Sequence, residues 1–262
     1  MPAVMPTVTP AVTPAGSRFG LPPGIEAGLF DLDGVLTKTA ELHAAAWKEM
    51  LDAFLQARAA QLGGDFVPFD RIADYAKYVD GKPRYDGVRS FLESREIVLP
   101  EGLPTDSPEV KTIAGLANLK NELVLELLRR KGVEPFEGSV RYVHALLAAG
   151  LHCGVVSSSA NCRDVLVAAD IADLFEVRID ALVAQLAHLN GKPAPDTYLA
   201  ASDALGIPPA RAAVFEDALA GVAAAKAGAF GFVVGVDRIG QADALREHGA
   251  DVVVQDLGDL LD

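Results

Sequence analysis

Apolar residues along this chain gather in short runs, and longer segments with helical spacing stand between them. The runs that predict strands cover residues 26–31, 151–157, 212–216, 230–236 and 251–254. The segments that predict helices cover residues 40–61, 139–149, 161–169, 196–205, 218–227 and 241–248. Strands that alternate with helices in this way are typical of a parallel sheet with helices on both faces. We therefore predict a doubly wound, Rossmann-like α/β fold.

The first two predicted strands are separated by about 120 residues, far more than one crossover helix between parallel strands requires. This interval has a helical periodicity of its own, over 40–61, Phe69–Val79, Tyr85–Ser94 and Glu109–Lys131. The run Gly132-Val133-Glu134-Pro135 can return the chain to the sheet. These observations predict an all-helical cap domain over 40–134, inserted into a catalytic core formed by 25–39 and 135–262.

Composition sets the first 24 residues apart, because prolines recur among them and charged side chains are nearly absent. We expect a disordered, proline-rich tail over 1–24. The whole chain has a formal net charge of −13, which disfavours nucleic acid and anionic membrane surfaces as partners. No apolar run in the sequence approaches the ~18–20 residues that span a bilayer. The two cysteines fit a reducing compartment. We expect a cytoplasmic protein that is a monomer or a weak oligomer.

Two carboxylates stand two residues apart at the end of the first predicted strand, in the run Phe30-Asp31-Leu32-Asp33-Gly34. Side chains alternate along a strand, so a continued strand would point both acids to one face, and Gly34 would then let the chain turn. Two anions held close together repel unless a cation or a shared proton compensates. The pair therefore indicates a divalent metal site or acid–base chemistry, although a strand end before a solvated turn has the same pattern.

Three further segments carry polar side chains at a predicted strand end or in a loop. They are Val155-Val156-Ser157-Ser158-Ser159, Gly191-Lys192-Pro193-Ala194-Pro195-Asp196 and Ala213-Val214-Phe215-Glu216-Asp217. In an open parallel sheet, ligands bind outside the carboxyl ends of the strands. We therefore expect all four segments to converge on one site beneath the cap.

An acid pair, a serine, a lysine and a second acid pair, in this order, resemble the four motifs of the haloacid dehalogenase superfamily over roughly residues 25–255. The helical cap after the first strand resembles that of the β-phosphoglucomutase-like subclass. The resemblance implies a haloacid dehalogenase type of core and, in most members, phosphoryl transfer. It makes Asp31 the nucleophile, which would form an aspartyl phosphate.

A carboxylate that attacks an anionic phosphoryl group needs a cation to neutralise charge. Mg²⁺ suits a site made of oxygen ligands, and we assign Asp31 and Asp217 as side-chain ligands. Glu216 is expected either to bind the metal directly or to support a ligand. The resemblance implies that the backbone carbonyl of Asp33 is a further ligand. The Asp33 side chain is then free to act as general acid and base.

The remaining core residues are expected to bind the phosphoryl group. Lys192 would offset negative charge on the nucleophile and on the phosphoryl oxygens, and Ser157 would donate a hydrogen bond to it. Ser158, Ser159 and Asn161 precede a predicted helix, whose backbone N–H groups can also bind phosphate. Ser159 or Asn161 can instead be the N-cap of that helix.

The cap contains a loop with two cations, Asp80-Gly81-Lys82-Pro83-Arg84. It resembles the cap loop of β-phosphoglucomutases, in which an arginine holds the phosphate that is not transferred. Arg84 has the matching place, and its planar fork suits a phosphate dianion. Those enzymes often carry lysine where this chain has Asp80, and Lys82 can supply that charge from a shifted position. A surface salt bridge is the alternative role for Arg84.

Thr39, His43 and Trp47 follow the first motif at positions i, i+4 and i+8, so a helix would place them on one face. A similar run occurs in the same subclass. These residues are expected to form a hinge and a pocket face near Asp33. Packing within the cap is the alternative, and for Trp47 it is the interpretation that we prefer.

Taken together, the resemblance implies an Mg²⁺-dependent β-phosphoglucomutase that interconverts β-glucose 1-phosphate and glucose 6-phosphate. A phosphatase of sugar phosphates or other small molecules is the alternative, because it needs one phosphate grip where a mutase needs two. A catalytically silent binding protein is disfavoured because Asp31, Lys192 and Asp217 are all present. The expected partner is a small phosphorylated sugar.

Overall fold

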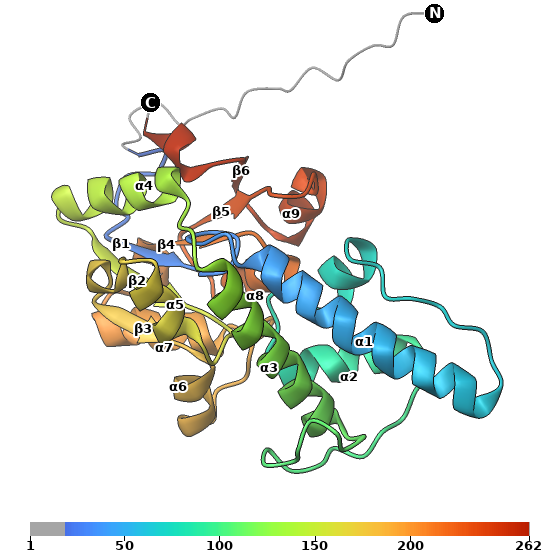
Figure 1. Ribbon diagram of the computed structural model, residues 1–262. Coiled ribbons are helices and arrows are strands. Elements are labelled where there is room, and N and C mark those ends of the chain that lie inside the picture. The colour runs from blue at the N-terminus through green and yellow to red at the C-terminus, as the bar shows by residue number, and fades with distance from the viewer. Residues whose placement is uncertain (1–18, 262) are drawn as a thin grey trace, which may run out of the picture.

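The computed structural model describes residues 19–261, and within them six parallel strands form one sheet in the order β3-β2-β1-β4-β5-β6. The predicted doubly wound α/β fold is confirmed. Figure 1 shows the sheet between helices, with the cap to one side. The strands are β1 (Ala27–Phe30), β2 (His152–Val156), β3 (Val177–Ile179), β4 (Ala212–Glu216), β5 (Phe232–Val236) and β6 (Val252–Val254).

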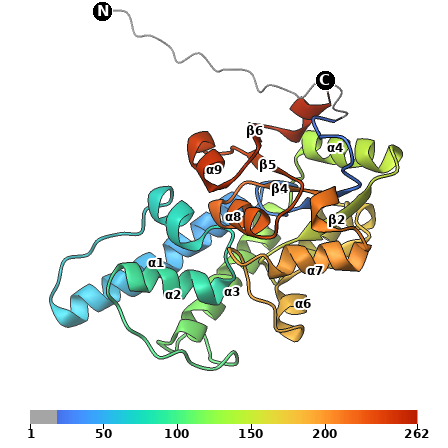
Figure 2. The same cartoon turned by 180° about the vertical axis from the view of Figure 1, so that it is seen from behind.

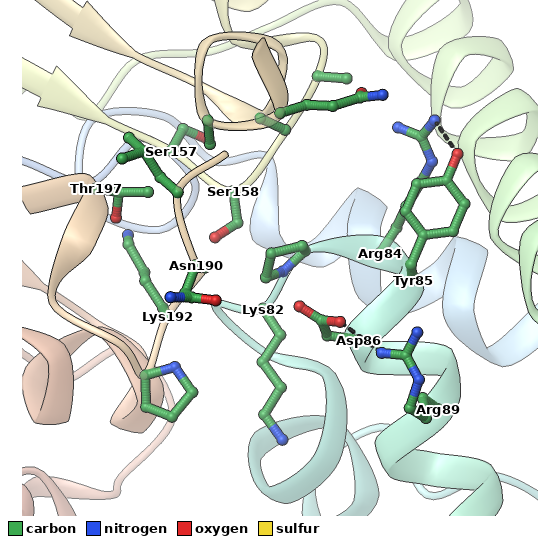
Figure 3. A pocket seen from close by; sticks show the side chains of 18 of the residues that line it. Lys82, Arg84, Tyr85, Asp86, Arg89, Ser157, Ser158, Asn190, Lys192 and Thr197 are labelled. Carbon is green, nitrogen blue, oxygen red and sulfur yellow. Dashed lines mark hydrogen bonds and ion pairs between the residues drawn. The ribbon is translucent and has the colours of Figure 1, made fainter. Parts of the chain in front are cut away.

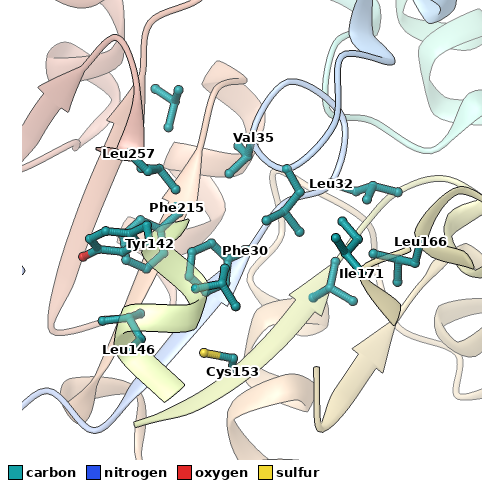
Figure 4. Packing of buried hydrophobic residues seen from close by; sticks show 14 of the residues in the cluster. Phe30, Leu32, Val35, Tyr142, Leu146, Cys153, Leu166, Ile171, Phe215 and Leu257 are labelled. Carbon is teal, nitrogen blue, oxygen red and sulfur yellow. The ribbon is translucent and has the colours of Figure 1, made fainter. Parts of the chain in front are cut away.

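Six helices of the described residues belong to the core. They are α4 (Glu137–Ala148), α5 (Cys162–Ala168), α6 (Ala181–Leu186), α7 (Asp196–Leu205), α8 (Leu219–Ala227) and α9 (Ala242–His248). Adjacent residues of β1 point to opposite faces, so Phe30 packs in the cluster under α4 and α5, while Leu29 packs in the cluster under α7, α8 and α9. In Figure 4, Phe30 lies beside Phe215 of the neighbouring strand, and the two rings stack with centroids 4.4 Å apart. Both faces of the central strands are therefore buried, which explains why the sequences of these strands are continuous apolar runs.

The cap consists of α1 (Ala40–Leu62), a π-helical turn (Tyr75–Val79), α2 (Arg84–Ser94) and α3 (Ile113–Lys131). These elements enclose an apolar cluster of their own, centred on residues such as Trp47, Met50 and Phe91. Figure 2 shows the cap beside the core rather than wrapped around it. No helix of the described residues is both long enough and apolar enough to cross a membrane.

The chain passes between core and cap at two places that lie side by side. The backbone N–H of Lys38 donates to the carbonyl of Glu134 at 2.8 Å, and that of Phe136 donates to the carbonyl of Leu36 at 2.9 Å. The Lys38 ammonium also contacts the Glu134 carboxylate at 3.0 Å. This hinge of two paired segments, 36–38 and 134–136, holds together the chain that leaves the core and the chain that returns to it.

The structure departs from the predicted helix over 69–79. Only the π-helical turn and the two residues before it are helical there, because the backbone of Phe69 bonds to side chains of α1 instead. Its N–H donates to the Asp52 carboxylate at 2.7 Å, and its carbonyl accepts from Lys48 at 3.0 Å. Helix α3 begins at Ile113 rather than at 109, because the Thr112 hydroxyl accepts the N–H of Gly115 as an N-cap.

Strand β3 and helix α6 were absent from the sequence prediction, since three strand residues and six helical residues are too short for a clear period. The predicted tail over 1–24 falls largely on residues 1–18, which lie outside the described residues. Its last residues are described, and Leu21 is buried in the core cluster beside α4. The packed core therefore begins before residue 25.

Candidate active site

A buried lysine joins the carboxyl ends of three neighbouring strands. The ammonium of Lys192 lies 2.5 Å from Oδ1 of Asp31, which follows β1, and 2.6 Å from Oε1 of Glu216, which ends β4. It also donates to the carbonyl of Val156 in β2 at 3.2 Å. Lys192 is 2 % exposed, so both ion pairs are shielded from water. The structure thus brings the first, third and fourth sequence motifs into direct contact.

Burial and ion pairing shift the pKa values of Lys192 and Asp31 in opposite directions. Burial alone would lower the pKa of Lys192, but Asp31 and Glu216 raise it well above its usual range, so the ammonium keeps its proton. Burial raises the pKa of Asp31, and Lys192 is the neighbour that counters this effect. One ammonium between two carboxylates leaves a net negative charge that a cation would neutralise.

Three buried carboxylates form a cluster at this edge of the sheet: Asp31, Glu216 and Asp217 each offer an oxygen within 4.8 Å of the others. Glu216 is held by Lys192, by the Tyr198 hydroxyl at 2.9 Å and by the N–H of Ala218 at 3.0 Å. No donor of the described residues bonds to the Asp217 carboxylate. An all-oxygen set with free lone pairs fits a hard divalent cation.

The surrounding backbone is shaped to leave these carboxylates room. A Cβ atom on Gly34 would overlap the carboxylate of Asp217, and one on Gly221 would overlap that of Glu216. Gly34 also has φ +91°, a conformation that other residues rarely adopt. Both glycines are therefore required by the cluster. The Asp33 side chain is not part of this set.

The side chain of Asp33 faces the cap. The Thr39 hydroxyl donates to its Oδ1, and Nε2 of His43 lies 3.6 Å from the same oxygen. On the far side of the imidazole, the Lys120 ammonium lies 2.9 Å from Nδ1 of His43. While Lys120 is an ammonium it can only donate, so Nδ1 then accepts and the imidazole proton lies on Nε2, toward Asp33. Thr39 and His43 thus lie where the sequence analysis expected them.

Burial lowers the pKa of both His43 and Lys120. Burial, together with the nearby ammonium, lowers the pKa of His43 to about 4, so its ring is neutral. Burial lowers the pKa of Lys120 to about 7. The Lys120 ammonium also lies 5.0 Å from the centre of the Trp47 ring. Trp47 is both part of the cap cluster and part of the cavity wall, so the two roles considered for it are combined.

The sequence analysis missed Lys120 and Tyr198. A signal for the first was present, because Lys120 shares the buried face of α3 with Leu116, Ala117 and Val124. A lysine on the apolar face of an amphipathic helix is unusual enough to mark a site. Tyr198 gave no such signal, since a tyrosine in a core helix is ordinary.

The serine segment after β2 connects core and cap. The Ser157 hydroxyl is buried and accepts the N–H of Ser159 at 3.1 Å. The Ser158 hydroxyl donates to the carbonyl of Gly81 in the cap at 2.7 Å. Asn161 stands at the N-cap position of α5, but its amide donates to Asn121 of α3 at 3.0 Å instead of capping the helix. Ser158 and Asn161 therefore hold the cap against the core.

We define the lid loop as residues 80–84. Gly81 has φ +69°, and a Cβ there would lie 2.8 Å from the Cβ of Ala218. A Cβ on Gly191, next to Lys192, would overlap the ring of Pro83. The loop thus touches the core at three of its four motifs. It leaves a cavity of about 50 Å³ between Asp31 and Arg84, room for a few water molecules at most, so the lid must lift to admit a sugar.

Arg84 has no acidic partner among the described residues. Its guanidinium donates to the Tyr85 hydroxyl at 3.2 Å and lies 4.8 Å from the centre of that ring, as Figure 3 shows. Its Nε is buried without a hydrogen-bond partner. Lys82 donates to Ser90 at 2.9 Å and lines the same cavity. The salt-bridge alternative for Arg84 therefore does not hold in this structure, and its guanidinium is available to an anion.

Replacing Lys120 by methionine removes a buried charge and keeps most of the side chain. Between the folded pKa of about 7 and the ordinary value of 10.5, the unfolded chain binds the extra proton, so this group makes the wild type more stable as pH rises. The difference in Tm, Lys120→Met minus wild type, should therefore be more positive at pH 6 than at pH 9, as measured by differential scanning fluorimetry.

Lys111→Met is the control, because Lys111 is exposed and its loss should change Tm equally at both values of pH. An effect of Lys120→Met that is independent of pH would contradict the buried, deprotonating lysine.

Comparison with known proteins places this geometry in a family. Residues 25–228 match the model of the haloacid dehalogenase-like hydrolases. The chain is 55% identical to the β-phosphoglucomutase of Mycobacterium tuberculosis over 92% of its own length and 94% of that protein's. It is 32% identical to the β-phosphoglucomutase of Bacillus subtilis, over 90% and 92% of the two chains.

Solved structures agree with these relatives. A β-phosphoglucomutase from Clostridium difficile superposes with a TM-score of 0.67 at 26% identity, covering 90% of this chain and 93% of the other. The protein CbbY from Rhodobacter sphaeroides, solved in complex with phosphate, gives 0.65 at 26% identity over 90% and 96%. With the four motifs gathered around Lys192 beneath a helical cap, these matches lead to one conclusion: the chain belongs to the haloacid dehalogenase-like hydrolase family.

Proposed function

We propose that this protein is an Mg²⁺-dependent β-phosphoglucomutase that interconverts β-glucose 1-phosphate and glucose 6-phosphate. The observation that carries the proposal is a pair of cationic side chains on opposite sides of the site, each able to bind a phosphate group. Lys192 on the core side and Arg84 on the cap side line one cavity, and Arg84 has no acidic partner among the described residues. The identity of 55% to a curated β-phosphoglucomutase supports the same activity.

In this reaction Asp31 acts as nucleophile. Its carboxylate forms a bond to phosphorus while the bond from phosphorus to the leaving oxygen breaks. Lys192, held as an ammonium, offsets the charge that gathers on the phosphoryl oxygens. Mg²⁺ at the carboxylate cluster would neutralise the repulsion between nucleophile and phosphoryl group. Asp31, Asp217 and Glu216 are the residues that would hold it, with the Asp33 carbonyl as the further ligand that the family implies.

Asp33 is proposed as the general acid and base. It gives a proton to the leaving sugar oxygen and takes one from the hydroxyl that attacks the aspartyl phosphate. The Thr39 hydroxyl donates to its Oδ1, and Nε2 of His43 lies 3.6 Å from the same oxygen, which leaves the other oxygen for the sugar. Lys120 fixes the imidazole tautomer from behind. Thr39, His43 and Lys120 together keep Asp33 oriented while the bound bisphosphate reorients in the site.

The other core residues support phosphate binding and closure. The Ser157 hydroxyl and the backbone N–H of Ser158 are proposed to bind the transferring phosphoryl group. The contact of Ser158 with Gly81 supports closure of the lid over the reaction. A mutase depends on such closure, because its aspartyl phosphate must outlast encounters with water.

A sugar-phosphate phosphatase is the second candidate. It would use the same first step and let water complete the second. The observation that favours it is Asp80, an acid in the lid loop where β-phosphoglucomutases often carry lysine. The free guanidinium of Arg84 favours the mutase, because a phosphatase has no second phosphate to hold.

The products formed from β-glucose 1-phosphate test the activity directly. With Mg²⁺ and a trace of the 1,6-bisphosphate, we expect glucose 6-phosphate to exceed free phosphate by far, measured by a coupled dehydrogenase and by molybdate. Chelation should stop the reaction and Mg²⁺ should restore it. Asp31→Asn should abolish turnover without loss of fold. Free phosphate as the main product would make the protein a phosphatase.

Arg84→Ala should raise the activation free energy that corresponds to kcat/KM for β-glucose 1-phosphate by about 2–5 kcal/mol, because a desolvated, charge-assisted pair is lost. Arg84→Lys should recover only part of this, since lysine cannot form the bidentate fork. Phosphorylation of Asp31 by acetyl phosphate, which carries a single phosphate, is the control and should change little. An unchanged mutase rate would show that the cap holds no phosphate through Arg84.

Gly191→Ala should raise the share of aspartyl phosphate that is lost to water. The added methyl group would meet the Pro83 ring, so the lid loop could not seat on the core. We expect a higher ratio of free phosphate to glucose 6-phosphate. Gly64→Ala is the matched control, because a Cβ there meets nothing. An unaltered ratio in Gly191→Ala would argue that this contact does not exclude water.

A further inference from the structure

The lid loop brings a further carboxylate, that of Asp80, to the cavity beside the core cluster. Asp80 ends the π-helical turn, and its N–H donates to the carbonyl of Tyr75 at 3.0 Å. The next residue, Gly81, packs on Ala218, which directly follows Asp217. Asp80 accordingly lines the same cavity as Asp31, Asp33 and Asp217. The sequence analysis treated this acid only as a departure from the family pattern.

The partners of Asp80 leave its charge uncompensated. The Tyr75 hydroxyl and the N–H of Gly81 are its hydrogen-bond partners, and both are neutral. No lysine, arginine or histidine of the described residues forms an ion pair with it. Burial raises the pKa of Asp80 to about 7, and the charge of Asp80 is the largest neighbouring influence that raises the pKa of Asp217.

Closure of the lid therefore adds a negative charge to a site that already holds four carboxylates. Among the described residues, Lys192 forms the ion pairs of that cluster, with Asp31 and Glu216, while Arg238 interacts with Asp217 electrostatically without an ion pair. Like charges that line one small cavity repel, and this repulsion opposes closure. A divalent cation on Asp217 would reverse the sign of the interaction and attract the lid.

We propose that Asp80 is an outer-sphere ligand of the divalent cation, so that the bound cation holds the lid loop on the core. The inference rests on the cation assigned under the proposed function. Asp80 does not belong to the set of carboxylates within 4.8 Å of one another, so it would reach the cation through a coordinated water, which Mg²⁺ readily retains. A lysine at this position would instead attract the carboxylates directly, with no cation needed.

This arrangement links two equilibria. If the cation favours the closed lid, the closed lid must favour the cation by the same factor. The loss of the Asp80 charge should therefore weaken cation binding as well as closure. An aspartate that served only to cap the lid turn would have no such effect, because asparagine can accept the same two hydrogen bonds.

Calorimetric titration of Mg²⁺ into the full chain, without sugar, measures the first equilibrium. In Asp80→Asn the Kd for Mg²⁺ should rise roughly tenfold or more, the usual consequence of removing an outer-sphere partner. Asp80→Glu keeps the charge and should recover part of the affinity. Asp65→Asn is the matched control, since Asp65 is an exposed acid of the cap, and its Kd should equal that of the wild type.

Tryptophan fluorescence measures the second equilibrium. The chain has one tryptophan, Trp47, which lines the cavity beneath the lid and is 3% exposed in the closed structure. Addition of Mg²⁺ to the wild type should shift its emission to shorter wavelength as the lid closes. In Asp80→Asn the same shift should require about tenfold more Mg²⁺, or be lost.

The outcomes separate this inference from the one on which it rests. If the wild type bound no Mg²⁺, the metal assignment of the proposed function would fail, and the role of Asp80 with it. If the wild type bound Mg²⁺ and Asp80→Asn bound it equally well, with the same fluorescence shift, only the role of Asp80 would be refuted. Circular dichroism of each variant verifies that a weaker Kd does not reflect unfolding.

Discussion

A single buried ammonium decides how the active site is assembled. Lys192 contacts carboxylates from two strands and a carbonyl from a third, so it fixes the strand ends relative to one another. Without it, Asp31 and Glu216 would be two buried anions side by side, a strongly unfavourable arrangement. With it, one carboxylate oxygen of each is engaged and the cluster still has a net negative charge. The same contact therefore holds the fold together at this edge and creates the demand for a metal.

The core could be predicted from the sequence because its signals are local. Apolar runs of four or five residues mark β1, β2, β4 and β5, and the chemistry-bearing residues stand directly at their ends. Strand β3 was missed because three residues define no period. The cap was predicted less well over 69–79, where Asp52 and Lys48 of α1 bond to the backbone of Phe69. Such side-chain competition for the backbone depends on tertiary contacts, and no local pattern contains it.

The candidate site divides in the same way. Asp31, Lys192, Glu216 and Asp217 could be placed together because parallel strands present their carboxyl ends at one edge. The residues supplied by the cap could not, since their position depends on how the cap docks. Lys120 follows His43 by 77 residues and meets it only in the folded cap. For the same reason Asp80 could be identified as unusual in the sequence, but its neighbours could not be named.

The separation of apolar clusters has a consequence for how such proteins diversify. The cluster around Trp47 and Phe91 lies within the cap, while the buried residues of the clusters on the two faces of the sheet lie within the core, and Leu128 and Val133 of the cap pack at the edge of one of them. The cap can therefore tilt about the hinge of two paired segments without exposing the interior of either the cap or the core. It can also accumulate substitutions without unfolding the sheet that carries Asp31 and Lys192. Natural selection can thus alter which molecules are recognised while the reactive machinery stays unchanged.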